Sequence, residues 1–128
     1  MPTFRDPQLV LFSDDLSRAV AFYSRLGFVE IFRVPTEGQP SHVDLTLDGY
    51  KIGIASVAST RDDHGLAPIP EGQRAAVILW TDDAAAAFAE VTANGAPPLA
   101  GPHEWLGRLL IAWIADPDGN PIQIVQPL

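Results

Sequence analysis

The sequence contains no cysteine, which excludes disulfides, thiolate metal ligands and thiol nucleophiles in one step. It has no apolar run long enough to span a bilayer, and its first residues lack a basic segment followed by an apolar stretch. We therefore expect a cytoplasmic protein with no membrane partner.

Basic residues are scarce, with 8 Lys and Arg against 16 Asp and Glu, giving a net charge of -8. Such a charge repels phosphate backbones and attracts cations, so nucleic acid is not an expected partner. The same acidity also favours solubility, and the charge by itself does not separate the two roles.

Several catalytic signatures are missing. The sequence has no Gly-x-Ser-x-Gly elbow and no glycine-rich strand-to-helix turn that would hold a phosphate or a dinucleotide. We therefore assign no catalytic residue and expect no cofactor.

An internal repeat is the main feature that is present. Residues 13–27 recur as residues 81–95 with the Asp-Asp pair and the closing glycine retained, and Asp48-Gly49-x-x-Ile-x-Ile recurs from Asp118. A chain of 128 residues is about one domain, so the copies should share one core. We expect modules over residues 1–58 and 74–128, joined by a linker over 59–73.

Each module reads as β-α-β-β-β. In the first, apolar residues at period 3.6 predict a helix over 16–26, which Gly27 ends. Alternating or apolar runs between turn signals predict the strands at 8–12, 28–34, 43–47 and 50–55, with second-module equivalents near 98–99, 108–115 and 121–125. The expected fold class is α+β, with two tandem βαβββ modules.

Two motifs carry a resemblance to a known family. The helix pattern Leu16-x-x-Ala-Val-x-Phe-Tyr-x-x-Leu-Gly-Phe28 and the closing turn Asp116-Pro-Asp-Gly-Asn-Pro-Ile122 resemble the vicinal oxygen chelate superfamily. This is the glyoxalase, bleomycin-resistance and extradiol-dioxygenase group. The resemblance implies a cup built from two modules, in which metal-using members bind one divalent ion through the first and last strands of each module.

By this resemblance the four ligand positions fall on Gln8, Gly53, Ala76 and Gln123. A catalytic divalent ion needs imidazole or carboxylate donors, which none of these residues supplies. Gln also occupies the first position in some metal-dependent glyoxalases, where a His and two Glu accompany it. We therefore expect the metal-free, bleomycin-resistance-like branch, with no metal ligand assigned.

Strand periodicity suggests what lines the cup. If Gln8 points inward, so does Phe12, and the repeat carries this to Trp80. These two aromatics are expected to sandwich a flat ligand or cover a cation, or else to seal the core between the modules.

The run 42–47 alternates, so His42, Asp44 and Thr46 share the face opposite Val43 and Leu45. That face is the cup or plain solvent. In the cup, Asp44 would pair with a cationic group, and His42 would donate a hydrogen bond or act as a base.

The segment 103–108 contains Trp105 and resembles a lid loop at the rim of the cup, whereas His64 reads as a solvated linker residue. No two of the three histidines, including His103, have metal-ligand spacing.

These features predict a metal-independent protein that binds or sequesters a hydrophobic or cationic aromatic molecule, as in antibiotic resistance. The predicted ligand contacts are Gln8, Phe12, His42, Asp44, Trp80, Trp105 and Gln123, and Glu104 is a further possible counter-charge. The alternative is a lyase, isomerase, epimerase or dioxygenase-type enzyme, with His42, Asp44 or His103 as base, or with a metal on Gln8 and His42. A third possibility is a protein that acts through association alone. The resemblance also implies a homodimer.

Overall fold

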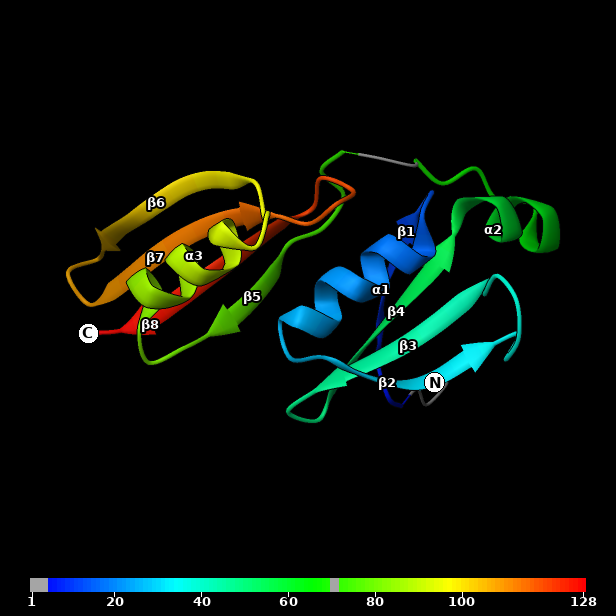
Figure 1. Cartoon of the computed structure of the whole chain (residues 1–128), viewed down its shortest axis with the longest axis horizontal. Helices are drawn as coiled ribbons and strands as arrows, with labels where there is room; N and C mark the ends of the chain where they lie inside the picture. The colour runs from blue at the N-terminus through cyan, green and yellow to red at the C-terminus, as the bar shows by residue number, and fades with distance from the viewer. Residues whose placement is uncertain (1–4, 70–71) are drawn as a thin grey trace, which may run out of the picture. The chain divides into compact units, whose positions relative to one another are not determined.

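The structure is a computed structural model that describes residues 5–69 and 72–128, and the chain divides into two compact units, Met1–Pro70 and Glu71–Leu128 (Figure 1). The first unit contains β1 (Leu9–Ser13), α1 (Leu16–Arg25), β2 (Val29–Val34), β3 (His42–Leu47), β4 (Tyr50–Ser56) and α2 (Val57–His64). The second contains β5 (Val77–Trp80), α3 (Ala84–Ala93), β6 (Pro98–Trp105), β7 (Leu109–Ala115) and β8 (Pro121–Pro127).

Each unit is built on one four-stranded mixed sheet. The strand orders are β1-β4-β3-β2 and β5-β8-β7-β6, so the two sheets have the same connectivity. In each sheet the first strand runs parallel to the last, and the remaining pairs are antiparallel. The predicted α+β class and the two βαβββ modules are confirmed.

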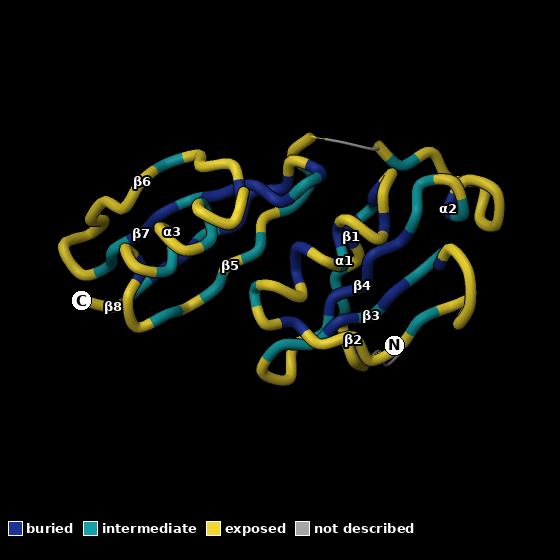
Figure 2. The backbone as a smooth tube through the Cα atoms, in the orientation of Figure 1, coloured by how far each residue is buried: buried dark blue, intermediate teal, exposed yellow. Residues whose placement is uncertain are grey.

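The core of the first module lies between α1 and one face of its sheet. Asp15 caps the helix by accepting a hydrogen bond from the Arg18 backbone N–H at 3.1 Å. Tyr23 is fully buried, and its ring meets those of Phe22 and Phe28 edge to face at 5.4 and 5.5 Å. Figure 2 shows burial concentrated on the inner strands β3 and β4, and on β7 and β8 in the second module.

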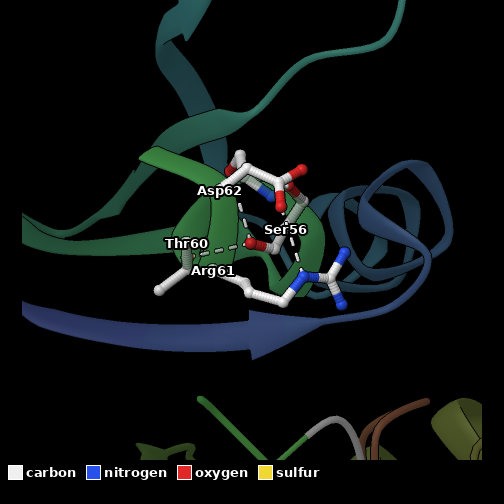
Figure 3. A network of polar contacts seen from close by, with 5 residues as sticks. Ser56, Thr60, Arg61 and Asp62 are labelled. Carbon is white, nitrogen blue, oxygen red and sulfur yellow. Dashed lines mark hydrogen bonds and ion pairs between the residues drawn. The ribbon is translucent and has the colours of Figure 1, made fainter. Parts of the chain in front are cut away.

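One helix was not predicted from the sequence. Helix α2 occupies part of the segment expected to be a linker. Ser56 caps it by accepting from the Ser59 N–H at 3.1 Å, and the Thr60 hydroxyl donates to the Ser56 carbonyl at 2.8 Å (Figure 3). The helix has no apolar stripe, and Thr60 is its buried residue, so the period-3.6 signal is missing.

The second correction concerns the expected lid. Residues 103–105 are not a loop but the end of β6, with His103 opposite Ile111 and Trp105 opposite Leu109. The chain turns through Leu106, Gly107 and Arg108, with positive φ angles of 57° at Leu106 and 64° at Gly107. Trp105 is therefore held on a paired strand beside this turn.

The closing turn of the second module is tightly bonded. Asp116 is 3% exposed and accepts from the backbone N–H groups of Asp118 and Asn120 at 2.9 and 2.8 Å, and from Asn120 Nδ2 at 2.9 Å. The Gly72 N–H donates to the Asp118 carbonyl at 2.9 Å, which fastens the start of the module to this turn.

Within the described ranges, no helix is long and apolar enough to cross a membrane.

Candidate ligand-binding site

The candidate site lies on the sheet face of the first module that points away from the buried core. Alternation along β3 buries Val43 and Leu45 and leaves His42 and Asp44 on the other face. Asp44 lies opposite Gly53 on β4, and Gly53 lies beside Val10 on β1, so Gln8 just before β1 reaches the same place.

Three polar side chains meet at one oxygen atom. Gln8 Nε2 donates to Asp44 Oδ1 at 2.7 Å, and His42 Nε2 lies 2.7 Å from the same oxygen. A carboxylate only accepts hydrogen bonds, so His42 Nε2 carries the proton and Nδ1 holds a free lone pair when the ring is neutral. We call Gln8, His42 and Asp44 the polar cluster.

Gly53 provides the space for the polar cluster. A Cβ atom at this position would lie 2.9 Å from Gln8 Nε2, 3.0 Å from Asp44 Oδ1 and 3.0 Å from His42 Cε1. Real Cβ atoms essentially never come within 3.0 Å of another atom, so a side chain here would displace the Gln8 amide and crowd the Asp44 and His42 side chains. The glycine is needed for a close approach of neighbouring side chains rather than for an unusual backbone angle.

Replacing Gly53 with alanine is therefore expected to separate the three polar groups while the fold is retained. Gly101 on β6 is the matched control, because it also has an ordinary φ angle and a Cβ there would meet nothing within 4 Å. In ¹H–¹⁵N spectra, we expect the side-chain signals of Gln8 and His42 to shift in Gly53→Ala and to stay in place in Gly101→Ala. Unchanged signals in both variants would show that the cluster does not depend on this glycine.

Exposed apolar side chains border the polar cluster. Val10 on β1 is 37% exposed, and Phe32 and Val34 on the edge strand β2 are 51% and 45% exposed. The Phe32 ring lies 6.4 Å from the His42 ring at an angle of 63°. Phe12 is half-buried on the same face of β1 as Val10. A few polar groups within an apolar border are typical of a small-molecule site.

The charges around the cluster are partly screened by solvent. The side chains of His42 and Asp44 are 30% and 15% exposed. On the edge strand, Arg33 donates two hydrogen bonds to Glu30 at 2.8 and 2.9 Å, which lowers the pKa of the Glu30 carboxyl and raises that of the Arg33 guanidinium. This basic residue is therefore already paired with a carboxylate.

The second module presents an apolar surface at the equivalent positions. Gln123 on β8 lies beside Ile78 of β5 and opposite Trp113 of β7, and Ile78 is 55% exposed. Trp80, two residues along β5, is 65% exposed. Sequence reasoning missed Trp113, whose place on the Gln123 face depends on the strand register.

Of the predicted site residues, the structure brings Gln8, His42 and Asp44 together in one cluster, with Phe12 on the same sheet face. Trp80 and Gln123 belong to the second module, and Trp105 is 54% exposed at the end of β6. That Phe12 and Trp80 share one cavity stays a prediction. Ligand contact by each of these residues also stays a prediction.

Among the described residues, the structure records no hydrogen bond between the polar cluster and either of the other two histidines, His64 and His103. His64 is the last residue of α2 rather than part of an irregular loop. His103 Nδ1 lies 2.8 Å from the Gly101 carbonyl on the same strand.

The four positions that the family resemblance aligns with metal ligands do not supply a metal-binding donor set here. Gln8 and Gln123 offer neutral amides, and Gly53 and Ala76 offer no side-chain donor. Within residues 5–69 and 72–128, no three His, Cys, Asp or Glu side chains gather as a set that could hold an ion. The residues present do not fit the divalent ion that metal-using relatives bind.

Comparison with known proteins identifies the family. The sequence model of the Glyoxalase/Bleomycin resistance protein/Dioxygenase superfamily matches residues 7–124, and the chain belongs to this superfamily. Among proteins with curated descriptions, none matches the chain.

Solved structures of similar proteins share the fold. A glyoxalase/bleomycin resistance protein/dioxygenase from Nocardioides is 21% identical, with a TM-score of 0.76, covering 98% of this chain and 87% of that one. TioX from Micromonospora sp. ML1 is 23% identical with a TM-score of 0.73, covering 96% and 100%. Virulence protein STM3117 from Salmonella typhimurium is 25% identical with a TM-score of 0.71, covering all of both chains. The chain has the vicinal oxygen chelate fold of these neighbours.

Proposed function

We propose that this protein binds a small hydrophobic or cationic aromatic molecule without a metal ion, as a sequestering or resistance-type protein. The observation that carries the proposal is the polar cluster, in which the Gln8 amide and the His42 ring hold one partly exposed carboxylate, Asp44, inside an apolar border. We further propose that it acts in the cytoplasm as a homodimer.

The electrostatics of Asp44 favour a cationic ligand. Its side chain is 15% exposed, so the carboxylate has lost much of its hydration and interacts with a nearby charge more strongly than a fully solvated group would. Gln8 and His42 compensate part of this loss with two hydrogen bonds to the same oxygen. The net charge of -8 adds a favourable long-range potential for cations.

The neighbouring aromatic rings suit a flat ligand. Phe32 stands exposed beside His42, and a ring or a cation against its face would gain about 1 kcal/mol. Trp80, Trp105 and Gln123 of the second module remain predicted ligand contacts. Exposed aromatics next to few polar groups support an organic ligand better than a hydrated ion.

A screen of cationic and neutral aromatic compounds tests the proposal. A ligand present at a hundred times its Kd stabilises the folded state by about 2.7 kcal/mol, which should raise the melting temperature by several degrees. The three tryptophans, Trp80, Trp105 and Trp113, all lie in the second module, so their emission reports that module only. The melting temperature is therefore the primary readout. If no compound raises it and none changes the emission, the protein does not bind this ligand class.

An enzyme on the same scaffold is a second candidate, favoured by one observation. The Asp44 carboxylate holds the proton of His42 on Nε2, which leaves Nδ1 able to accept a proton from a bound molecule. Ligands found in the screen can be incubated with the protein in D₂O and followed by ¹H NMR. If the protein causes a carbon-bound proton signal of the ligand to disappear and the His42→Gln variant does not, the result would support the enzyme. Unchanged spectra with both proteins would support binding alone.

A further inference from the structure

The polar cluster has three hydrogen-bond acceptors left over. Asp44 accepts both bonds of the cluster through Oδ1, and for residues 5–69 the structure records no hydrogen bond to Oδ2. Gln8 Oε1 and His42 Nδ1 likewise have no partner within these residues. A neutral imidazole whose Nε2 carries the proton accepts at Nδ1, so all three atoms are acceptors.

These three acceptors are open to solvent. The side chains of His42 and Asp44 are 30% and 15% exposed and Gln8 is half-buried, and no atom of these three residues is among the buried side-chain atoms without a hydrogen-bond partner. Water or a ligand can therefore bond to each of the three atoms.

From this arrangement we infer that the site recognises a planar cation with several N–H donors, such as an amidinium or a guanidinium, carried on an aromatic or apolar group. The inference rests on the proposed function and names the ligand class of the same site. One carboxylate supplies the counter-charge, and the neighbouring amide oxygen and imidazole nitrogen accept further N–H bonds. Charged, multiply bonded pairs of this kind are stronger and more directional than a simple ion contact.

The surroundings of the cluster fit a flat group. Gly53 has no side chain above the sheet at the point where the three polar groups meet, and a Cβ there would already be within 3.0 Å of each. The exposed Phe32 ring flanks His42 on the neighbouring strand β2. The three polar side chains themselves fill the space above Gly53, so a planar group would meet the cluster from its solvent side and place its apolar part against the phenyl ring.

Three probes with one phenyl ring separate the contributions. Benzamidine carries a planar cation with N–H donors, phenyltrimethylammonium carries a cation without N–H donors, and benzamide carries N–H donors without the charge. We expect isothermal titration calorimetry to give a Kd for benzamidine at least about tenfold lower than for either of the other two probes, because only benzamidine meets both requirements.

Variants locate the binding. Asp44→Asn is expected to reduce the preference for benzamidine over the other two probes to about threefold or less. Asp63→Asn removes an exposed charge on α2 of the same module and is expected to leave this preference unchanged. If Asp44→Asn does not fold, Gln8→Leu removes one acceptor and keeps the carboxylate. The preference for benzamidine should then fall while the affinity for phenyltrimethylammonium stays constant.

The outcomes distinguish this inference from the proposed function. Equal affinity for both cations would overturn the N–H recognition and leave cation binding in place. Benzamide binding as tightly as benzamidine would overturn the role of the charge. If none of the three probes binds while the compound screen finds another aromatic ligand, the inference fails and the proposed function stands. If neither the probes nor the screened compounds bind, both fail.

Discussion

Replacing Asp44 with asparagine is expected to weaken the binding of cationic aromatic ligands by about ten- to a hundredfold, which corresponds to roughly 1.5–3 kcal/mol. Asparagine has the same shape and keeps an oxygen that can accept from Gln8 Nε2. It removes the negative charge that a cationic ligand would meet. The change therefore tests the charge with little alteration of packing.

The control for this variant is Asp63→Asn, which makes the same chemical change at an exposed helical position of the same module. Calorimetric titration should give unaltered affinity in the control and a large loss at position 44, while both variants keep the melting temperature to within a few degrees. A loss of less than about twofold at position 44 would mean that the carboxylate is not the counter-charge.

Replacing Asp116 with alanine is expected to lower the free energy of unfolding by about 3 kcal/mol and the melting temperature by roughly 10 °C. This buried carboxylate accepts three N–H bonds within the closing turn. Alanine would leave buried donors of Asp118 and Asn120 without their acceptor. Because the start of the second module is fastened to this turn through Gly72, the loss should extend beyond the turn itself.

Two comparisons make the stability prediction specific. Asp82→Ala, at an exposed position of the same module, should change the stability by about 0.5 kcal/mol or less. Asp116→Asn should cost about 1 kcal/mol, because Asn120 Oδ1 is buried without a partner in the described ranges and can accept from the new amide if the Asn120 side chain turns over. Equal unfolding midpoints for the alanine and asparagine variants in urea would contradict this account of the turn.

Much of the fold could be predicted from the internal repeat. The Asp-Asp pair before each helix and the Gly27 and Gly95 positions after them mark the same unit twice, and the structure places helix caps at Asp15 and Asp83 as this pattern requires. The two differences have physical reasons. Helix α2 lacks an apolar stripe, and the end of β6 depends on a turn at Leu106 and Gly107 that composition does not distinguish from a longer loop.

The candidate site could be predicted only in part. Strand alternation placed His42 and Asp44 on one face, because a period of two is visible in the sequence. The contact between Asp44 and Gln8 was not predicted, since it depends on β1 pairing with β4 and on the register of Asp44 opposite Gly53. The same register gives Gly53 its role as the position that leaves room for three polar groups. Tertiary pairing of this kind is not encoded in a local pattern.

The two modules have diverged at equivalent positions of the repeat. The first carries the polar cluster around Gly53, whereas the second carries Gln123 beside Ile78 and Trp113. One sheet face thus offers acceptors and a carboxylate, and the other offers mainly apolar and aromatic surface.

The most direct test of the central claim is to map a bound ligand on the metal-free protein by NMR. The protein would be treated with a chelator and titrated with benzamidine or with the tightest compound from the screen. We predict that the signals of Gln8, His42, Asp44 and Gly53 shift on titration, that Gly101 stays unmoved, and that adding zinc or nickel changes nothing. Shifts confined to other residues, or binding that appears only after the metal is restored, would contradict a metal-independent site at the polar cluster.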